Sequence, residues 1–181
     1  HMGRRTAWDD GDWLPVQAPS NIRERAHRAF PKVMELYDID RVIGNFADAA
    51  RRCQLGGFDG IEVLSHSHLL GQFLSPATNQ RNDGYGGSLD NRMRLTLQVL
   101  DAIRAEVGSA FIISMRITGD ELSDDGLTNE ECIEIARRLE QSGHIDLLNI
   151  VVGAPYDDLG LAQWVPPMGM QVSQHLSLVG K

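Results

Sequence analysis

The sequence predicts an α/β fold built from parallel βαβ units. Between residues 38 and 152, helix-like and strand-like segments alternate along the chain of 181 residues. The strand-like segments are almost entirely apolar, as is typical of strands buried on both faces of a parallel sheet. The glycine-rich segment after the first strand lacks the G-x-G-x-x-G arrangement of dinucleotide-binding folds. We therefore expect a partial (β/α)8 TIM barrel rather than a doubly wound sheet.

The first predicted unit follows an irregular region at residues 1–37, which holds three of the seven prolines and shows no sustained periodicity. From residue 38 onward, apolar side chains fall on one face of a helix. Asp40 can cap this helix, and the glycine pair at 56–57 can end it. The short apolar run at residues 60–64 then indicates a strand.

The second unit follows a polar, glycine-rich loop at residues 75–87. Ser88 is expected to open a helix that ends at Gly108, and residues 111–116 are expected to form the next strand.

The third unit begins with a capping-box pattern made by Thr128 and Glu131. Its helix is expected to end at Gly143, and residues 146–152 to form a third buried strand.

The chain is too short to close a barrel, which needs about 250 residues. We expect one incomplete barrel domain over residues 1–181, with βα units at 38–152, then a loop and the start of the next helix at 153–181. A further strand is expected just before or at His1. Because an unclosed sheet leaves strand edges unpaired, the strands could instead re-pair as an open sheet or across a dimer.

Composition excludes some classes of function. Seventeen basic residues against 25 acidic ones give a net charge of -8, which disfavours nucleic acid as a partner. No run of about 18 apolar residues and no signal peptide is visible, so we expect a cytoplasmic protein without a membrane span. Cys53 and Cys132 lack metal-ligand spacing and are interpreted as buried thiols.

Catalytic groups in barrel enzymes follow the carboxyl ends of strands, and this rule selects His66 and His68. At spacing two on an extended segment, the two rings would point the same way and could bind a metal or hold a substrate oxygen or anion. The alternative is that they only donate hydrogen bonds to backbone carbonyls in a loop.

Arg116 is the third candidate, because it ends an otherwise apolar strand where an unpaired guanidinium is costly to bury. Either an anionic ligand or a carboxylate, Glu62 or Asp120, must compensate its charge.

The loop at 75–87 and its flanks carry a more specific pattern, Gln72-Phe73-Leu74-Ser75-Pro76, Asn79, Arg81, Asp83, Tyr85-Gly86-Gly87-Ser88 and Asn91-Arg92. This pattern resembles the signature of the old yellow enzyme family of NADH:flavin oxidoreductases. Residues 46–50 and 57–63 are similar to the helix and fourth strand that precede the signature in that family, and residues 1–5 to the end of its third strand.

The resemblance implies roughly strands three to six of an FMN-binding barrel, in which hydride passes between flavin N5 and a small organic substrate. Enoate reduction and amine oxidation or demethylation are both expected in this family, with NADH or NADPH as a potential electron donor. Arg116 matches the arginine that faces the flavin N1 and O2 edge, and His1 is also assigned to the cofactor site. His66 matches a residue that holds the substrate oxygen over the flavin.

His68 lies where many members have a tyrosine that donates a proton to the substrate. The missing tyrosine, and a stretch at 62–72 that is one residue shorter than usual, favour the branch of trimethylamine dehydrogenase and related N-demethylases.

Several alternatives stay open at this point. The family's phosphate-binding loops lie outside the chain, so we expect weak FMN binding or none by this segment alone. A metal-dependent hydrolase using His66 and His68 as ligands, or an inactive fragment, would fit the same residues. The expected partner is a small-molecule substrate, and homo-oligomerisation is left open.

Overall fold

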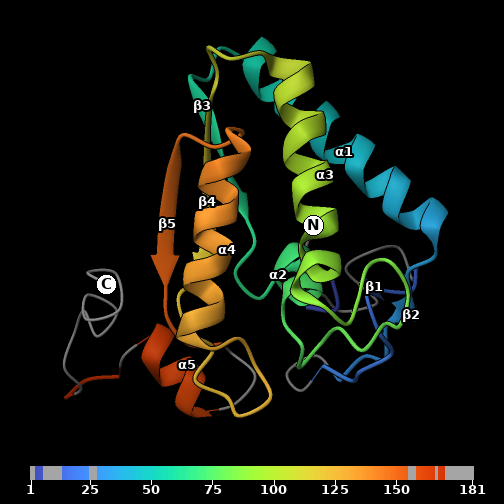
Figure 1. The fold of residues 1–181 in the computed structure, drawn as a ribbon, viewed down its shortest axis with the longest axis vertical. Helices are drawn as coiled ribbons and strands as arrows, with labels where there is room; N and C mark the ends of the chain where they lie inside the picture. The colour runs from blue at the N-terminus through green and yellow to red at the C-terminus, as the bar shows by residue number, and fades with distance from the viewer. Residues whose placement is uncertain (1–2, 6–13, 25–27, 155–157, 166, 170–181) are drawn as a thin grey trace.

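A three-stranded parallel sheet forms the centre of the fold. The computed structural model describes residues 3–5, 14–24, 28–154, 158–165 and 167–169 (Figure 1). The sheet contains β3 (Gly60–Leu64), β4 (Ile112–Thr118) and β5 (Leu147–Val151), in the order β3-β4-β5. This arrangement confirms the predicted α/β class with parallel strands. In the described part of the chain the sheet stays open, with β3 and β5 at its edges.

Three long helices accompany the strands: α1 (Leu36–Leu55), α3 (Leu89–Val107) and α4 (Asn129–Ser142). α1 packs beside α3, and α4 lies over β4 and β5 (Figure 1). Two short helices, α2 (Leu69–Leu74) and α5 (Asp158–Trp164), lie near the carboxyl ends of the strands. The alternation of βα units therefore places every long helix on the same side of the sheet.

The predicted start of α1 at Asp40 is wrong. The helix begins at Leu36, and Glu35 and Asp38 form a reciprocal capping box in which Asp38 accepts the Glu35 N–H at 3.0 Å. Asp38 is buried and paired with Lys32 at 2.7 Å, whereas Asp40 is exposed. Asp38, which lies two residues before Asp40, therefore provides the carboxylate that accepts a hydrogen bond at the start of the helix.

The other helix boundaries agree closely with the sequence pattern. Ser88 accepts from the N–H of Asn91, and Thr128 from that of Glu131. α4 ends at Gly143, which has a φ of 68° that suits glycine better than any other residue.

The irregular region contains a feature that periodicity did not predict. β1 (Gln17–Ala18) and β2 (Lys32–Val33) form a parallel pair of two residues each. Strands this short leave no alternation to detect in the sequence.

The two faces of the sheet differ in composition. Ile113, Met115 and Ile117 point to the helices and are fully buried in the core. The alternate positions point the other way and form what we call the open face: Glu62, Leu64, Ser114, Arg116, Thr118, Leu147, Asn149 and Val151. In a barrel this face corresponds to the interior, at whose carboxyl-end rim active sites lie.

Candidate active site

The segment after β3 forms a turn, and not the extended segment that was expected to carry the two histidines. Ser67 lies in the left-handed region with a φ of 56°, and its carbonyl accepts from Gln72 Nε2 at 3.0 Å. α2 packs so closely on this turn that a Cβ at Gly71 would lie 1.8 Å from the Ser65 carbonyl oxygen. The prediction that His66 and His68 point the same way is therefore wrong, because the turn sends them to different partners.

His66 is buried, with 2% of its surface exposed, and its Nε2 lies 2.8 Å from the carbonyl oxygen of Gly153. A carbonyl oxygen only accepts, so Nε2 carries the proton and donates it. Burial lowers the pKa of His66 from 6.5 to about 4, although the bond to Gly153 opposes this shift. The ring is therefore neutral near pH 7, and it ties the turn after β3 to the end of β5.

His68 is only half-buried, and its Nδ1 lies 2.7 Å from the carbonyl oxygen of His66. By the same reasoning Nδ1 is the protonated nitrogen, which leaves Nε2 as an acceptor in the neutral ring. Burial lowers the pKa of His68, and the nearby positive charge of Arg5 lowers it further. A neutral His68 can accept a proton or a hydrogen bond at Nε2, but it has no proton to donate there.

Arg116 lies on the open face and is paired with Glu62, whose Oε2 is 2.6 Å from Arg116 Nη2. Of the two carboxylates that the sequence offered as alternatives to an anionic ligand, Glu62 rather than Asp120 is therefore the partner. About a third of the guanidinium side chain stays exposed, at 36%. Its Nε is buried and has no hydrogen-bond partner among the described residues. The pair thus leaves the cation accessible from the open face.

The signature loop acts as a scaffold in the structure. Asn79 donates to the carbonyl oxygens of Phe73 and Tyr85, both at 2.7 Å. Arg81 donates to the carbonyl oxygen of Met34 at 2.6 Å, joining the loop to the irregular region. These bonds fix the loop between α2 and α3, and so they hold the turn that carries the two histidines.

Glu121 is a buried carboxyl that the sequence did not single out. It accepts from Ser75 Oγ at 2.6 Å and from the N–H of Leu127 at 2.8 Å, and burial raises its pKa. It connects the loop after β4 to the start of the signature loop. No sequence signal distinguishes it from the exposed acidic residues around it, because its burial depends on tertiary packing.

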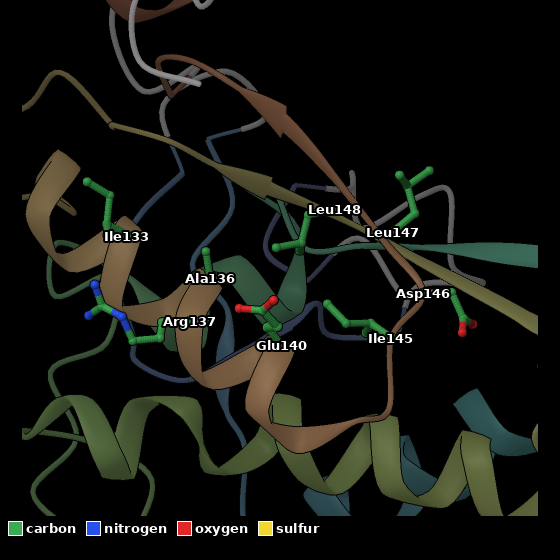
Figure 2. Close-up of a pocket in the computed structure, with 8 residues that line it drawn as sticks. All are labelled: Ile133, Ala136, Arg137, Glu140, Ile145, Asp146, Leu147 and Leu148. Carbon is green, nitrogen blue, oxygen red and sulfur yellow. The ribbon is translucent and has the colours of Figure 1, made fainter. Parts of the chain in front are cut away.

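A groove of about 440 Å³ lies elsewhere, between α4 and the start of β5 (Figure 2). Its walls are mainly apolar, from Ile133 and Ala136 on the helix to Leu147 and Leu148 on the strand. It is open at the edge of the sheet, and the candidate site residues do not line it. Its size alone therefore does not make it an active site.

The prediction that His1 belongs to the cofactor site falls on a residue outside the described ranges. Within the described ranges, no helix is long and apolar enough to cross a membrane. The same ranges contain no group of three or more His, Cys, Asp or Glu side chains that could hold a metal ion, so they offer no support for the hydrolase alternative.

Comparison with known proteins adds independent findings. A sequence profile of the NADH:flavin oxidoreductase / NADH oxidase family matches residues 3–158. A probable N-methylproline demethylase from Rhizobium meliloti is 54% identical over 181 residues, which is 100% of this chain and 27% of that protein. An N,N-dimethylglycine/sarcosine dehydrogenase from Chromohalobacter salexigens is 45% identical over 179 residues, 98% of this chain and 26% of that protein. The chain thus spans about a quarter of the length of these relatives.

A solved structure of 2-naphthoyl-CoA reductase with 2-naphthoyl-CoA superposes with a TM-score of 0.81 and 31% identity. The match covers 87% of this chain and 26% of that chain. It confirms the predicted fold, a section of a (β/α)8 barrel.

Proposed function

Because the chain belongs to the NADH:flavin oxidoreductase / NADH oxidase family, we propose that it supplies one side of the FMN and substrate site of an amine-oxidising enzyme. The family match confirms the resemblance read from the signature loop. The demethylase and dehydrogenase names of the relatives confirm the expected branch. The activity of the whole protein is our proposal.

The tautomer of His68 is the observation that carries the choice of reaction. Alkene reduction needs a residue that gives a proton to substrate carbon, whereas amine oxidation needs one that takes the N–H proton from the protonated form of the substrate amine. His68 Nδ1 is committed to the His66 carbonyl oxygen at 2.7 Å, so Nε2 is the acceptor. The lowered pKa keeps this ring neutral near pH 7. The site is therefore better suited to an amine than to an enoate.

The residues present fit the family's cofactor. Arg116 offers an accessible cation on the open face, at the end of the sheet where barrel enzymes bind their ligands. We propose that this guanidinium lies along the N1 and O2 edge of the isoalloxazine ring, where it favours negative charge. When bound, FMN supplies the two-electron chemistry, either by accepting a hydride from a carbon next to an amine nitrogen or by delivering one to an activated alkene.

The chain's own residues divide the remaining tasks. His66, neutral and bonded to Gly153 at 2.8 Å, holds the end of β3 against the end of β5. His68 Nε2 accepts the hydrogen bond or proton of the substrate amine. We infer that the substrate is a small N-methyl amino acid, because the relatives are named for N-methylproline, dimethylglycine and sarcosine.

We further propose NADH or NADPH as the electron donor for reductive reactions of this family, the cytoplasm as the location of the protein, and a homo-oligomer as its form of assembly.

The test uses the full-length, FMN-loaded protein and follows flavin bleaching by N-methylproline under anaerobic conditions. We expect His68→Gln to lower kcat/KM by about 100-fold, within the range for a lost general base. The pKa of His68 is lowered from 6.5, so the activity of the wild type should fall when the pH drops through that lowered pKa and the ring becomes protonated. The pH profile of His68→Gln should lack this decrease. The variant comparison matters because the substrate amine titrates as well.

A second variant, His68→Tyr, restores a proton donor at this position. It should raise the rate at which an α,β-unsaturated ketone oxidises the reduced protein, relative to the rate of amine oxidation. If wild type reduces the ketone readily and does not react with the amine, the proposal is wrong. An unchanged rate and pH profile in His68→Gln would also contradict it.

A further inference from the structure

We propose that Glu62 is a positioning residue for Arg116 and that its negative charge tunes the electron affinity of a flavin held against that arginine. The inference rests on the proposed function, since it concerns the same cofactor edge. It goes beyond that function because it assigns a role to a residue that need not contact either substrate or cofactor.

The geometry of the Glu62 carboxylate places it between two neighbours. Its Oε2 lies 2.6 Å from Arg116 Nη2, and its Oε1 accepts from Asn149 Nδ2 at 2.9 Å. The three residues come from β3, β4 and β5, so one carboxylate links all three strands of the sheet on its open face.

Strand register explains how Glu62 reaches both partners. Arg116 lies beside Leu64 on β3 and beside Asn149 on β5. Glu62 is two positions before Leu64, on the same face of its strand, so its side chain reaches diagonally towards the carboxyl ends. The amide of Asn149 fixes one carboxylate oxygen while the other holds the guanidinium. Arg116 is therefore oriented by residues that are rigidly placed in the sheet.

The pair is placed to act electrostatically on a ligand that approaches the open face. In the described residues, the side chains of Arg116 and Glu62 are 36% and 32% exposed on that face. A carboxylate beside the guanidinium offsets part of the positive potential that the cation presents to its surroundings. Removing that charge while keeping the side-chain size should make the same edge more electropositive.

The test uses the full-length, FMN-loaded protein and measures sulfite binding by the loss of visible flavin absorbance. Sulfite is a suitable probe because its reversible addition leaves negative charge at the N1 and O2 edge, independently of any substrate. We expect Glu62→Gln to bind sulfite about tenfold more tightly and Arg116→Gln to bind it about tenfold more weakly. Glu62→Asp keeps the charge and should stay within about threefold of wild type.

Ser114→Ala is the matched control, because Ser114 lies beside Glu62 on the same face and should leave sulfite affinity unchanged. The inference is wrong if Glu62→Gln binds sulfite like wild type while Arg116→Gln binds it more weakly. It is also wrong if Glu62→Gln and Glu62→Asp shift the affinity alike, because packing rather than charge would then explain both.

Two further outcomes are decisive. If Arg116→Gln retains FMN and wild-type sulfite affinity, the proposed role of Arg116 fails, and the role of Glu62 fails with it. If Glu62→Gln does not retain FMN, the result with Glu62→Asp tests the inference instead. A sulfite affinity like that of wild type in Glu62→Asp supports the role of the charge, and loss of FMN from Glu62→Asp as well overturns it.

Discussion

The two faces of the β3-β4-β5 sheet have opposite characters, although they alternate residue by residue along the same strands. The face towards the helices is made of aliphatic side chains such as Ile113 and Met115, which are fully buried. The open face carries Glu62, Arg116 and Asn149 in one connected group. Burial against helices stabilises the fold, whereas the polar group lies on the face where we propose the flavin site.

This difference means that stability and function can be changed separately by substituting neighbouring residues. A strand with side chains alternating between two faces gives natural pairs for comparison.

The largest effect on stability is expected at Ile113, whose replacement by alanine leaves a cavity against the helices. We expect Ile113→Ala to lower the free energy of unfolding by about 2–5 kcal/mol, measured by urea denaturation. Ser114→Ala, one residue later, should change it by less than about 0.5 kcal/mol, because Ser114 Oγ has no hydrogen-bond partner among the described residues. Equal losses in both variants would show that the faces are not distinct.

The next effect is a pH dependence centred on His66. In the unfolded chain the imidazole takes up a proton near its ordinary pKa of 6.5, whereas the folded protein resists this until about pH 4. Lowering the pH through this window therefore favours unfolding, by on the order of 3 kcal/mol from this group. His66→Asn should lack this component, so the stability difference between wild type and variant should shrink towards pH 4. A difference that is constant from pH 7 to pH 4 would contradict the assignment.

Cofactor binding should respond to the open face but not to the core. In the full-length protein, Arg116→Ala should weaken FMN binding by about ten- to hundredfold, as expected for a lost charge-assisted hydrogen bond. Flavin fluorescence in a titration measures this directly. The 181-residue chain alone should bind FMN much more weakly than the full-length protein. Tight binding by the chain would mean that these strands already form the flavin site.

The smallest effect is expected at a glycine far from either face. Gly44 lies exposed inside α1 with open space at its Cβ position, so Gly44→Ala should raise the free energy of unfolding by about 0.5–1 kcal/mol. Gly71→Ala should instead be destabilising, because the new Cβ would lie 1.8 Å from the Ser65 carbonyl oxygen. Thermal unfolding of both variants tests whether the turn that carries the histidines depends on this close contact.

The sequence predicted the long elements well, because their signals are local. Caps at Ser88 and Thr128 and the apolar run at 60–64 each require only a few neighbouring residues to be recognised. The start of α1 was misplaced because the capping box of Glu35 and Asp38 was not recognised in the sequence. In the structure, Asp38 is further distinguished from Asp40 by its ion pairs with Lys32 and Arg41.

The candidate site remains a prediction. Residue types and strand ends selected His66, His68 and Arg116 as candidates. Charge compensation left open whether an anionic ligand or a carboxylate would accompany Arg116, and the structure shows the carboxylate of Glu62. The directions of the two rings could not be predicted, because they depend on the left-handed backbone at Ser67. Neither could the burial of Glu121, which depends on segments that are distant in sequence.

The consecutive order of the strands has a consequence for how the protein folds. Within the β3-β4-β5 sheet each strand pairs with the next one along the chain, after at least one intervening helix. Gly60 pairs with Ile112, 52 positions later, and Ser114 with Leu147, 33 positions later, so each parallel pairing must close a long loop and is expected to form slowly. During synthesis on the ribosome, β4 can pair with β3, and β5 can then pair with β4, as each unit emerges. The unpaired edge of the strand already folded would provide the hydrogen-bonding groups for the next strand.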